Sequence, residues 1–235
     1  GEGTRMKSAR PKVLHELAGQ PMIDYALASA HAAGPEQKPV VVIGKGAEAV
    51  RAHLGDRADV VIQSERLGTG HAVLQARRLL AGRGGPVVVT YADMPLLRAE
   101  TLRALVQLQS GQGVPFSMLT VLADNPRGFG RVVRDESGAV RAIVEEAVAS
   151  SEQLAIRELN VGAYCFDAAW LWSHLDLLPP SPKGEYYLTD LAALAAAEGT
   201  PARALIAGDP DEVIGINTRA HLAEAEAALR KRINL

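Results

Sequence analysis

Short apolar runs alternate with turns and with stretches of helical periodicity along the first half of the chain. Three such runs each predict a buried strand, and a helix is predicted after each of them. The expected strands are 39–43, 59–63 and 86–91, and the expected helices are 47–54, 71–81 and 99–108. Three repeats of strand, turn and helix predict a parallel sheet covered by helices on both faces.

A further helix is predicted over 21–33, because proline suits the first helical position and Gly34 the position just after the end. Beyond residue 114 the apolar runs are separated by turns such as Glu136-Ser137-Gly138, which predicts a mixed, partly antiparallel region. Its expected strands are 116–122, 130–134, 139–145 and 158–166, and its expected helices are 168–175, 188–198 and 218–232. No linker divides the chain, so we expect one α/β domain with two sub-regions.

Composition excludes several classes of function. The 235 residues carry a formal net charge of −2, which does not favour binding to nucleic acid or to a membrane surface. The single cysteine, Cys165, rules out an internal disulfide and suits a reducing compartment, so a cytoplasmic location is expected. No apolar run is long enough to span a membrane.

The first twelve residues, GEGTRMKSARPK, indicate a phosphate-binding loop. Gly1 and Gly3 allow the backbone to approach a ligand closely, while Arg5 and Lys12 supply positive charge for phosphate oxygens. A dinucleotide-binding fingerprint would need a third glycine where Met6 stands, and no Walker motif is present. The loop therefore predicts triphosphate binding of another kind.

Asp93 follows the third predicted strand, where ligands bind in open parallel sheets. The side chain of Asp93 either caps a helix or a turn, or binds Mg²⁺ beside the phosphate loop, and the neighbouring loop favours the metal. The segment Gly68-Thr69-Gly70 enters a helix at the same edge, with Thr69 as its expected N-cap and its amides directed at a ligand.

The remaining polar residues have structural interpretations beside functional ones. Asn160 lies inside an apolar strand and needs a hydrogen-bond partner. The structural interpretation of Asn217 or Thr218 is that one of them caps the final helix. We give His71 no catalytic role. The histidines lack metal-site spacing and no G-x-S-x-G elbow occurs, so a hydrolase with a covalent nucleophile is not supported.

Together the motifs resemble the uridyltransferase domain of the bacterial bifunctional N-acetylglucosamine-1-phosphate uridyltransferase/glucosamine-1-phosphate acetyltransferases. The similarity covers nearly the whole chain, and the motifs occur in family order. They are GEGTRM, PKVLH, LGTGHA, YADMPL, GFGR, IVEE, LNVG, GEYYLTD and INTR.

The resemblance implies a Rossmann-like nucleotidyltransferase fold with a mostly parallel twisted sheet, flanking helices and a mixed antiparallel sugar-binding sub-region. It implies a nucleotidyltransferase domain over 1–218, with a nucleotide-binding half at 1–113 and a sugar-binding half at 114–218. Residues 219–235 would begin a linker to an acetyltransferase domain that is absent here, so the chain resembles a truncated form or a stand-alone uridyltransferase.

The resemblance also implies roles for single residues. Arg5, Lys12 and Asp93 would be catalytic, and Asp93 and Asn217 would bind Mg²⁺. The expected nucleotide-binding residues are Gly1, Gly3, Lys12, Gln63, Gly68 and Thr69. The expected sugar-phosphate-binding residues are Tyr91, Ala92, Gly130, Glu145 and Asn160.

Four features depart from the family pattern. The apolar strand that precedes the loop in the family is not part of this chain. Ala92 replaces a glycine, Val148 an acidic residue and Val161 a hydroxyl residue. None of these changes removes a residue that is expected to be catalytic.

By resemblance, the chain transfers uridylyl from UTP to N-acetylglucosamine-1-phosphate, giving UDP-N-acetylglucosamine for cell-envelope precursors such as peptidoglycan. Three rivals stay open: the same chemistry with another sugar or nucleotide, a non-catalytic nucleotide-sugar-binding paralogue, and a Rossmann oxidoreductase. In the family, full-length members are trimers whose contacts come largely from the half that is missing here, which leaves the oligomeric state of this chain open, with a monomer as one alternative.

Overall fold

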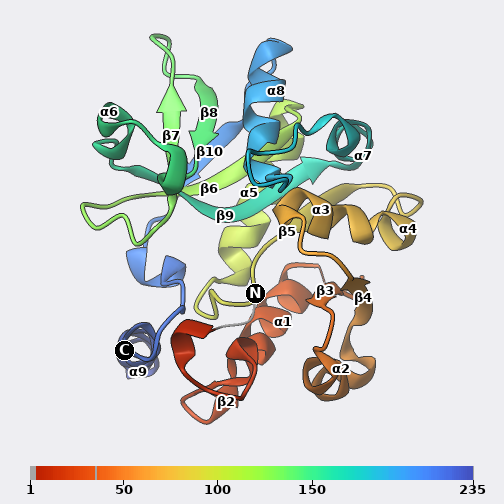
Figure 1. Ribbon diagram of the computed structural model, residues 1–235, viewed down its shortest axis with the longest axis vertical. Helices are drawn as coiled ribbons and strands as arrows, with labels where there is room; N and C mark the ends of the chain where they lie inside the picture. The colour runs from red at the N-terminus through yellow and green to blue at the C-terminus, as the bar shows by residue number, and fades with distance from the viewer. Residues whose placement is uncertain (1–3, 35, 235) are drawn as a thin grey trace. The chain divides into compact units, whose positions relative to one another are not determined.

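The structure is a computed structural model that describes residues 4–34 and 36–234 (Figure 1). The chain forms two compact units, each built from segments that are distant in sequence. Unit 1 comprises residues 1–62, 91–102 and 208–235, and unit 2 comprises residues 63–90 and 103–207. No described helix is both long enough and apolar enough to cross a membrane.

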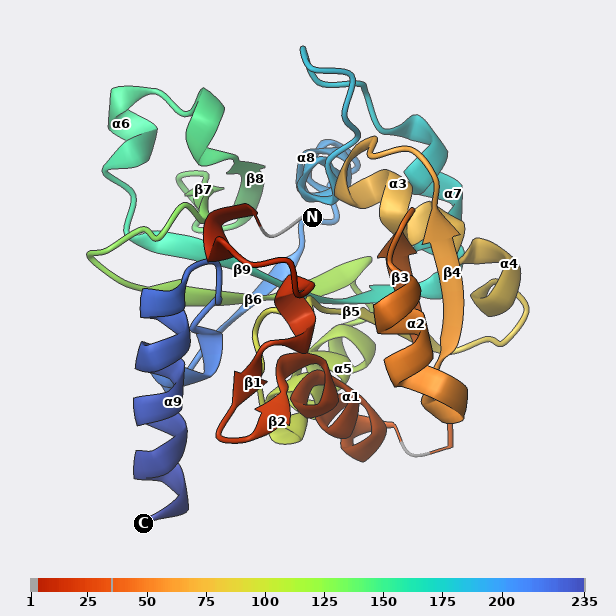
Figure 2. The same cartoon turned by 60° about the horizontal axis from the view of Figure 1, so that its bottom comes forward.

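Unit 1 is mainly helical and contains two small sheets. The strands β1 (Glu16–Leu17) and β2 (Gln20–Pro21) form an antiparallel hairpin, and β3 (Val40–Gly44) pairs with β4 (Asp59–Gln63). Figure 2 shows the hairpin beside α1. The helices are α1 (Met22–Ala33), α2 (Glu48–Leu54) and α9 (Arg219–Ile233).

Helix α1 ends where its sequence predicts but begins one residue later, because Pro21 is its N-cap and not its first helical residue. Pro21 precedes it and Gly34 forms its C-cap, with the Gly34 amide donating to the Ala30 carbonyl at 3.1 Å. Two apolar clusters stabilise the unit, one around Leu27 and Leu54 and the other around Met22 and Ile216. Burial of these side chains is the main favourable contribution to the free energy of folding.

Unit 2 is built around a mixed six-stranded sheet in the order β10-β6-β9-β7-β8, with β5 also paired to β9. Strand β10 runs parallel to β6, whereas β5, β6 and β7 run antiparallel to β9, and β7 antiparallel to β8. The strands are β5 (Pro86–Val89), β6 (Phe116–Leu122), β7 (Gly130–Arg134), β8 (Val140–Val144), β9 (Glu158–Asp167) and β10 (Arg203–Ile206).

Helices and short 3-10 turns complete the described chain. The helices are α3 (Gly68–Gln75), α4 (Arg77–Leu80), α5 (Ala99–Gln112), α6 (Ser151–Leu154), α7 (Ala168–His174) and α8 (Leu191–Ala197). The 3-10 turns are Thr4–Met6, Lys12–Leu14, Gly55–Arg57, Glu146–Val148, Leu175–Leu177, Leu188–Asp190 and Pro210–Val213.

Strand β9 carries the core of unit 2. Nine of its ten residues are buried or half-buried, and its rings Tyr164 and Phe166 pack against Phe116 of β6. The Phe116 and Phe166 ring centres are 4.8 Å apart. Cys165 is fully buried in the same strand, and burial raises the pKa of its thiol to about 12.

The expected α/β class, with a mixed sheet and flanking helices, is confirmed, but some local predictions are wrong. Strand β5 was expected in a parallel sheet, yet it pairs antiparallel with β9. A continuous apolar run carries no information about the direction of the partner strand. The predicted burial of this strand is also wrong, because Pro86 and Val88 of β5 are exposed and Val87 and Val89 are only half-buried. The strands β1, β2 and β10 and helix α6 were not predicted, because each is too short to show a period.

Candidate functional site

Four predicted site residues meet in unit 1. The Lys12 ammonium lies 2.5 Å from Asp93 Oδ2 and donates to Asn217 Oδ1 at 3.0 Å. Arg5 donates to the same Asn217 oxygen at 3.1 Å. The side chains of Lys12 and Asp93 are only 15% and 24% exposed, so solvent screens their attraction less than it would at an open surface. We call these four residues the Lys12–Asp93 cluster.

The local backbone leaves the side chains of Asp93 and Asn217 free to join this cluster. Asp93 lies in a turn six residues before α5, and therefore does not cap that helix. Thr218 is the N-cap of α9, with its hydroxyl accepting from the His221 amide at 3.2 Å. Capping is thus the role of Thr218, while Asn217 faces Lys12 and Arg5.

The oxygen donors of the cluster fit a hard divalent cation. Mg²⁺ is held in proteins by one or two carboxylates, completed by substrate phosphates and water. Asp93 and Asn217 supply one carboxylate and one amide oxygen, and both already accept from cationic groups. The described residues contain no group of three or more His, Cys, Asp or Glu that could hold a metal by itself. Any cation here would therefore share its coordination with a ligand.

A hollow of about 360 Å³ in unit 1 is lined by Arg5, Met6, Lys7 and Arg219. The Arg219 guanidinium donates to the Met6 carbonyl at 3.2 Å and to the Lys7 carbonyl at 3.4 Å. Three of the four lining residues are cationic and none is acidic, which favours an anion. Lys7 lies in the opening loop that was expected to supply positive charge for phosphate oxygens, whereas Arg219, which ends the INTR motif, was not predicted as a site residue.

In unit 2, the glycine segment at the start of α3 is held against Tyr186 and Leu188. The Gly70 amide donates to the Tyr186 carbonyl at 2.8 Å, and the Leu188 amide donates to Thr69 Oγ1 at 2.9 Å. The expected N-cap role of Thr69 is therefore wrong, since α3 already begins at Gly68. The Gly70 amide points to protein rather than to a ligand.

Gly68 is required at its position for two reasons. Its φ is +95°, and a Cβ placed there would lie 2.4 Å from the Tyr186 carbonyl oxygen. Gln63 donates to the Gly68 carbonyl at 3.0 Å, and its amide nitrogen also lies 3.0 Å from His71 Nδ1. His71 thus contacts a predicted nucleotide-binding residue, a contact that the sequence did not indicate.

Gly130, Glu145 and Asn160 come from neighbouring strands of the unit 2 sheet. Gly130 is paired with Asn160 in the register of β7 and β9, and Glu145 follows β8 directly. Asn160 is 7% exposed and donates to the Tyr164 hydroxyl at 2.7 Å, which confirms that its buried amide has a partner. Glu145 accepts from Thr189 at 2.9 Å.

Glu145 lies close enough to a second acidic residue, Asp190, to affect its pKa. Burial, and then the negative charge of Glu145, raise the pKa of Asp190 above its ordinary value. Two acidic groups therefore lie near the predicted sugar-binding strands. Their neighbourhood suits a ligand that donates hydroxyl or amide hydrogens.

Of the remaining predicted site residues, the structure describes Tyr91 and Ala92. Ala92 packs against the Leu27 cluster of unit 1, and the Tyr91 carbonyl accepts from the Met94 amide at 3.4 Å. Gly1 and Gly3 lie outside the described residues.

Comparison with known proteins supplies the family. Residues 1–157 match the MobA-like NTP transferase domain. The chain belongs to this family. Two solved structures share the NTP transferase fold over 99% of this chain and 96% of their own. They are apo-UDP-glucose pyrophosphorylase, with a TM-score of 0.74 and 17% identity, and UDP-glucose pyrophosphorylase complexed with UDP-glucose, with a TM-score of 0.72 and 19% identity.

Curated relatives of this NTP transferase chain share much more sequence. It is 49% identical over 234 residues to the bifunctional protein GlmU of Heliobacterium modesticaldum, and 46% identical over 238 residues to that of Pelobacter propionicus. The GlmU protein of Enterococcus faecalis is 41% identical over 235 residues. These alignments cover 99% to 100% of this chain and 51% of each relative. The chain thus spans about half the length of these relatives, and the resemblance seen in the motifs is confirmed.

Proposed function

We propose that the chain transfers the uridylyl group of UTP to N-acetylglucosamine-1-phosphate, with Mg²⁺ as cofactor. The observation that carries the proposal is the convergence of Lys12, Asp93, Asn217 and Arg5, which combines cations for phosphate with two oxygen ligands for a metal. The similarity to bifunctional GlmU proteins supports the same assignment.

The reaction needs no protein nucleophile. An oxygen of the sugar phosphate is already anionic and attacks the α-phosphorus of UTP, forming a new P–O bond. The bond from the α-phosphorus to the oxygen bridging the β-phosphorus breaks in line, and pyrophosphate leaves with that electron pair. Positioning and charge stabilisation therefore account for the catalysis.

The residues of unit 1 have distinct tasks in this scheme. Lys12 and Arg5 bind phosphate oxygens and neutralise the charge that develops on the leaving pyrophosphate. Asp93 and Asn217 would hold the Mg²⁺, which supplies Lewis-acid stabilisation of phosphate charge when bound. The hollow lined by Arg5, Lys7 and Arg219 has the charge to receive a phosphate group.

Unit 2 supplies the groups that would select the substrates. Gln63, Gly68 and Thr69 are the proposed contacts to the uracil base, and Gly130, Glu145 and Asn160 those to the amino sugar. In unit 1, Tyr91 and Ala92 are proposed to contact the sugar phosphate. Synthesis of cell-envelope precursors in the cytoplasm by a monomeric chain is part of the proposal.

Pyrophosphate release tests the proposal. UTP, N-acetylglucosamine-1-phosphate and Mg²⁺ should together give pyrophosphate, and omission of any one should abolish it. A panel of other nucleotides and sugar phosphates should give much lower rates, and a higher rate with one of them would reassign the substrate. No release, with UTP still raising the Tm, would instead identify a binding protein without activity.

A further inference from the structure

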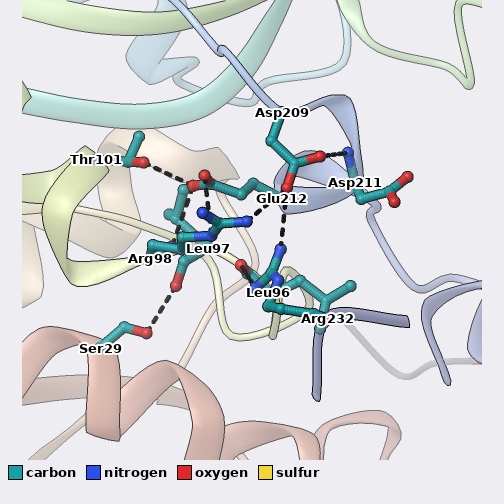
Figure 3. Close-up of polar contacts among 9 residues, drawn as sticks. All are labelled: Ser29, Leu96, Leu97, Arg98, Thr101, Asp209, Asp211, Glu212 and Arg232. Atoms are coloured by element: carbon teal, nitrogen blue, oxygen red, sulfur yellow. Dashed lines mark hydrogen bonds and ion pairs between the residues drawn. The ribbon is translucent and has the colours of Figure 1, made fainter. Parts of the chain in front are cut away.

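A polar network lies five residues away from each proposed metal ligand. Glu212 precedes Asn217 by five residues, and Arg98 follows Asp93 by five. Glu212 Oε2 accepts from the Arg98 amide at 3.2 Å and from the Thr101 hydroxyl at 2.6 Å, and Glu212 Oε1 lies 3.3 Å from Arg98 Nε (Figure 3). The Glu212 side chain is only 8% exposed.

Further contacts join the segment around Arg98 to the segment around Glu212, and join α9 to both. Arg98 Nη2 donates to Asp209 Oδ2 at 2.6 Å, and Arg232 of α9 donates to the Leu96 carbonyl at 2.9 Å while its second nitrogen lies 3.5 Å from Asp209. Figure 3 shows the side chains of Arg98 and Thr101 directed at Asp209 and Glu212, with Arg232 of α9 beside Asp209. We call Arg98, Thr101, Asp209, Glu212 and Arg232 the Glu212 network.

The chain between the network and the metal ligands is buried and apolar on both sides. Residues 94, 96 and 97 on one segment and residues 213, 214 and 216 on the other are all buried. At the far end, the Ile216 amide donates to the Asp93 carbonyl at 2.8 Å. Two closely packed segments fixed at both ends move little relative to each other, because packed interiors leave few voids.

We propose that the Glu212 network positions Asp93 and Asn217 for the divalent cation, so that Glu212 is a positioning residue for the metal site. Asp93 and Asn217 lie on irregular segments far apart in sequence, and no shared helix or sheet fixes their separation. Residues that hold metal ligands in place commonly change metal affinity by about 10–100-fold when they are removed. This inference rests on the proposed function.

Direct metal binding tests it with a readout other than activity. Mn²⁺, a paramagnetic substitute for Mg²⁺, is titrated into the full chain with an equimolar amount of UTP, and free Mn²⁺ is measured by electron paramagnetic resonance. A titration of the same UTP without protein is subtracted, because UTP itself binds Mn²⁺. Glu212→Ala should weaken Mn²⁺ binding about tenfold. Glu212→Gln retains acceptors for Thr101 and the Arg98 amide, so it should recover part of that loss. Thr101→Val removes one donor with little change of volume and should give a smaller loss.

Glu158→Ala is the matched control. Glu158 accepts two hydrogen bonds from Arg134 at 2.7 Å, and its side chain is 12% exposed, so the variant also removes a shielded arginine–carboxylate pair. It should lower the Tm and leave Mn²⁺ binding unchanged. If Glu212→Ala only lowers the Tm in the same way, the network is purely structural and the inference is wrong.

The outcomes also separate this inference from the proposed function. An unaltered chain that binds UTP and Mn²⁺, with Glu212→Gln and Thr101→Val binding Mn²⁺ equally well, overturns the positioning role alone. An unaltered chain that binds neither UTP nor Mn²⁺ overturns the proposed function and this inference with it. Glu212→Gln and Thr101→Val keep the test decisive even if Glu212→Ala does not fold.

Discussion

The two units build their predicted ligand sites by different physical means. In unit 1, the Lys12–Asp93 cluster consists of charged and amide side chains on irregular segments, joined by short ion pairs and hydrogen bonds. In unit 2, the backbone around Gly68 lies directly against the backbone of Tyr186. The predicted ligand residues Gly130 and Asn160 are instead held in place by the pairing and burial of their strands. Substitutions in unit 1 should therefore affect chemistry more than folding, and those in unit 2 should affect folding first.

The largest effect is expected at the Lys12–Asp93 cluster. Asp93→Ala and Lys12→Ala should each lower turnover by about 10²–10³-fold or more, because preorganised charge stabilisation is lost. Both variants should remain folded by circular dichroism, since neither side chain belongs to the apolar core of the unit. Pyrophosphate release measures the turnover.

Lys38→Ala is the control for this pair. Lys38 forms an exposed ion pair with Asp59 at 3.4 Å in the same unit, and exposed pairs contribute little to stability. It should keep normal turnover. Near-normal turnover in Asp93→Ala or Lys12→Ala would remove that residue from the proposed mechanism.

The next effect should fall on stability in unit 2. Gly68→Ala should destabilise the fold by about 2 kcal/mol or more, because alanine is strained at a positive φ and its Cβ would meet the Tyr186 carbonyl. Chemical denaturation measures the change. Gly138 also has a positive φ, of +83°, but open space around it. Equal losses in Gly138→Ala and Gly68→Ala would show that the close approach contributes nothing.

Two adjacent residues of unit 1 allow a sharper comparison of chemistry with folding. Asn217→Ala should raise the Mg²⁺ concentration that turnover requires, with little change in Tm, because its amide faces Lys12 and Arg5. Thr218→Ala should instead cost about 1 kcal/mol of stability through the lost N-cap. Mg²⁺ titrations and thermal melts of both variants measure this. An unchanged Mg²⁺ requirement in Asn217→Ala would take that residue out of the metal site.

The smallest effect is expected at Asp190. Its pKa is raised in the folded chain by burial and by the charge of Glu145, so its contribution to stability is full at low pH and is lost as the pH rises through the raised pKa. Asp190→Asn should therefore raise the Tm at pH 7 by roughly 2 °C, and the gain should shrink toward pH 4. Thermal melts across this range measure it, and a gain independent of pH would contradict the electrostatic cause.

Sequence alone predicted the local features well and the distant contacts poorly. Pro21 and Gly34 located α1, apolar runs located β6 and β7, and the position of Asp93 after an apolar run predicted it as a site residue. The contacts of Lys12 with Asp93 and with Asn217 join residues 81 and 205 positions apart, and no local pattern encodes such distances. The predictions of Lys12, Asp93 and Asn217 as partners therefore depended on the family resemblance.

The glycine segment shows the same limit in unit 2. Two glycines flanking Thr69 predicted a turn at a helix start, but the reason for them is the backbone of Tyr186 and Leu188. The contact from Leu188 to Thr69 spans 119 positions. The division of the chain into halves at residue 113 stays a prediction, as do the individual ligand contacts.

The interleaving of the two units has a consequence for biosynthesis. Synthesis proceeds from the N-terminus at about 5–20 residues per second, and domains tend to fold as units as they emerge. All of unit 2 has been made once residue 207 is added, whereas unit 1 still awaits residues 208–235. Those late residues include Glu212 and Asn217, so the nascent chain on the ribosome gains its proposed metal site last.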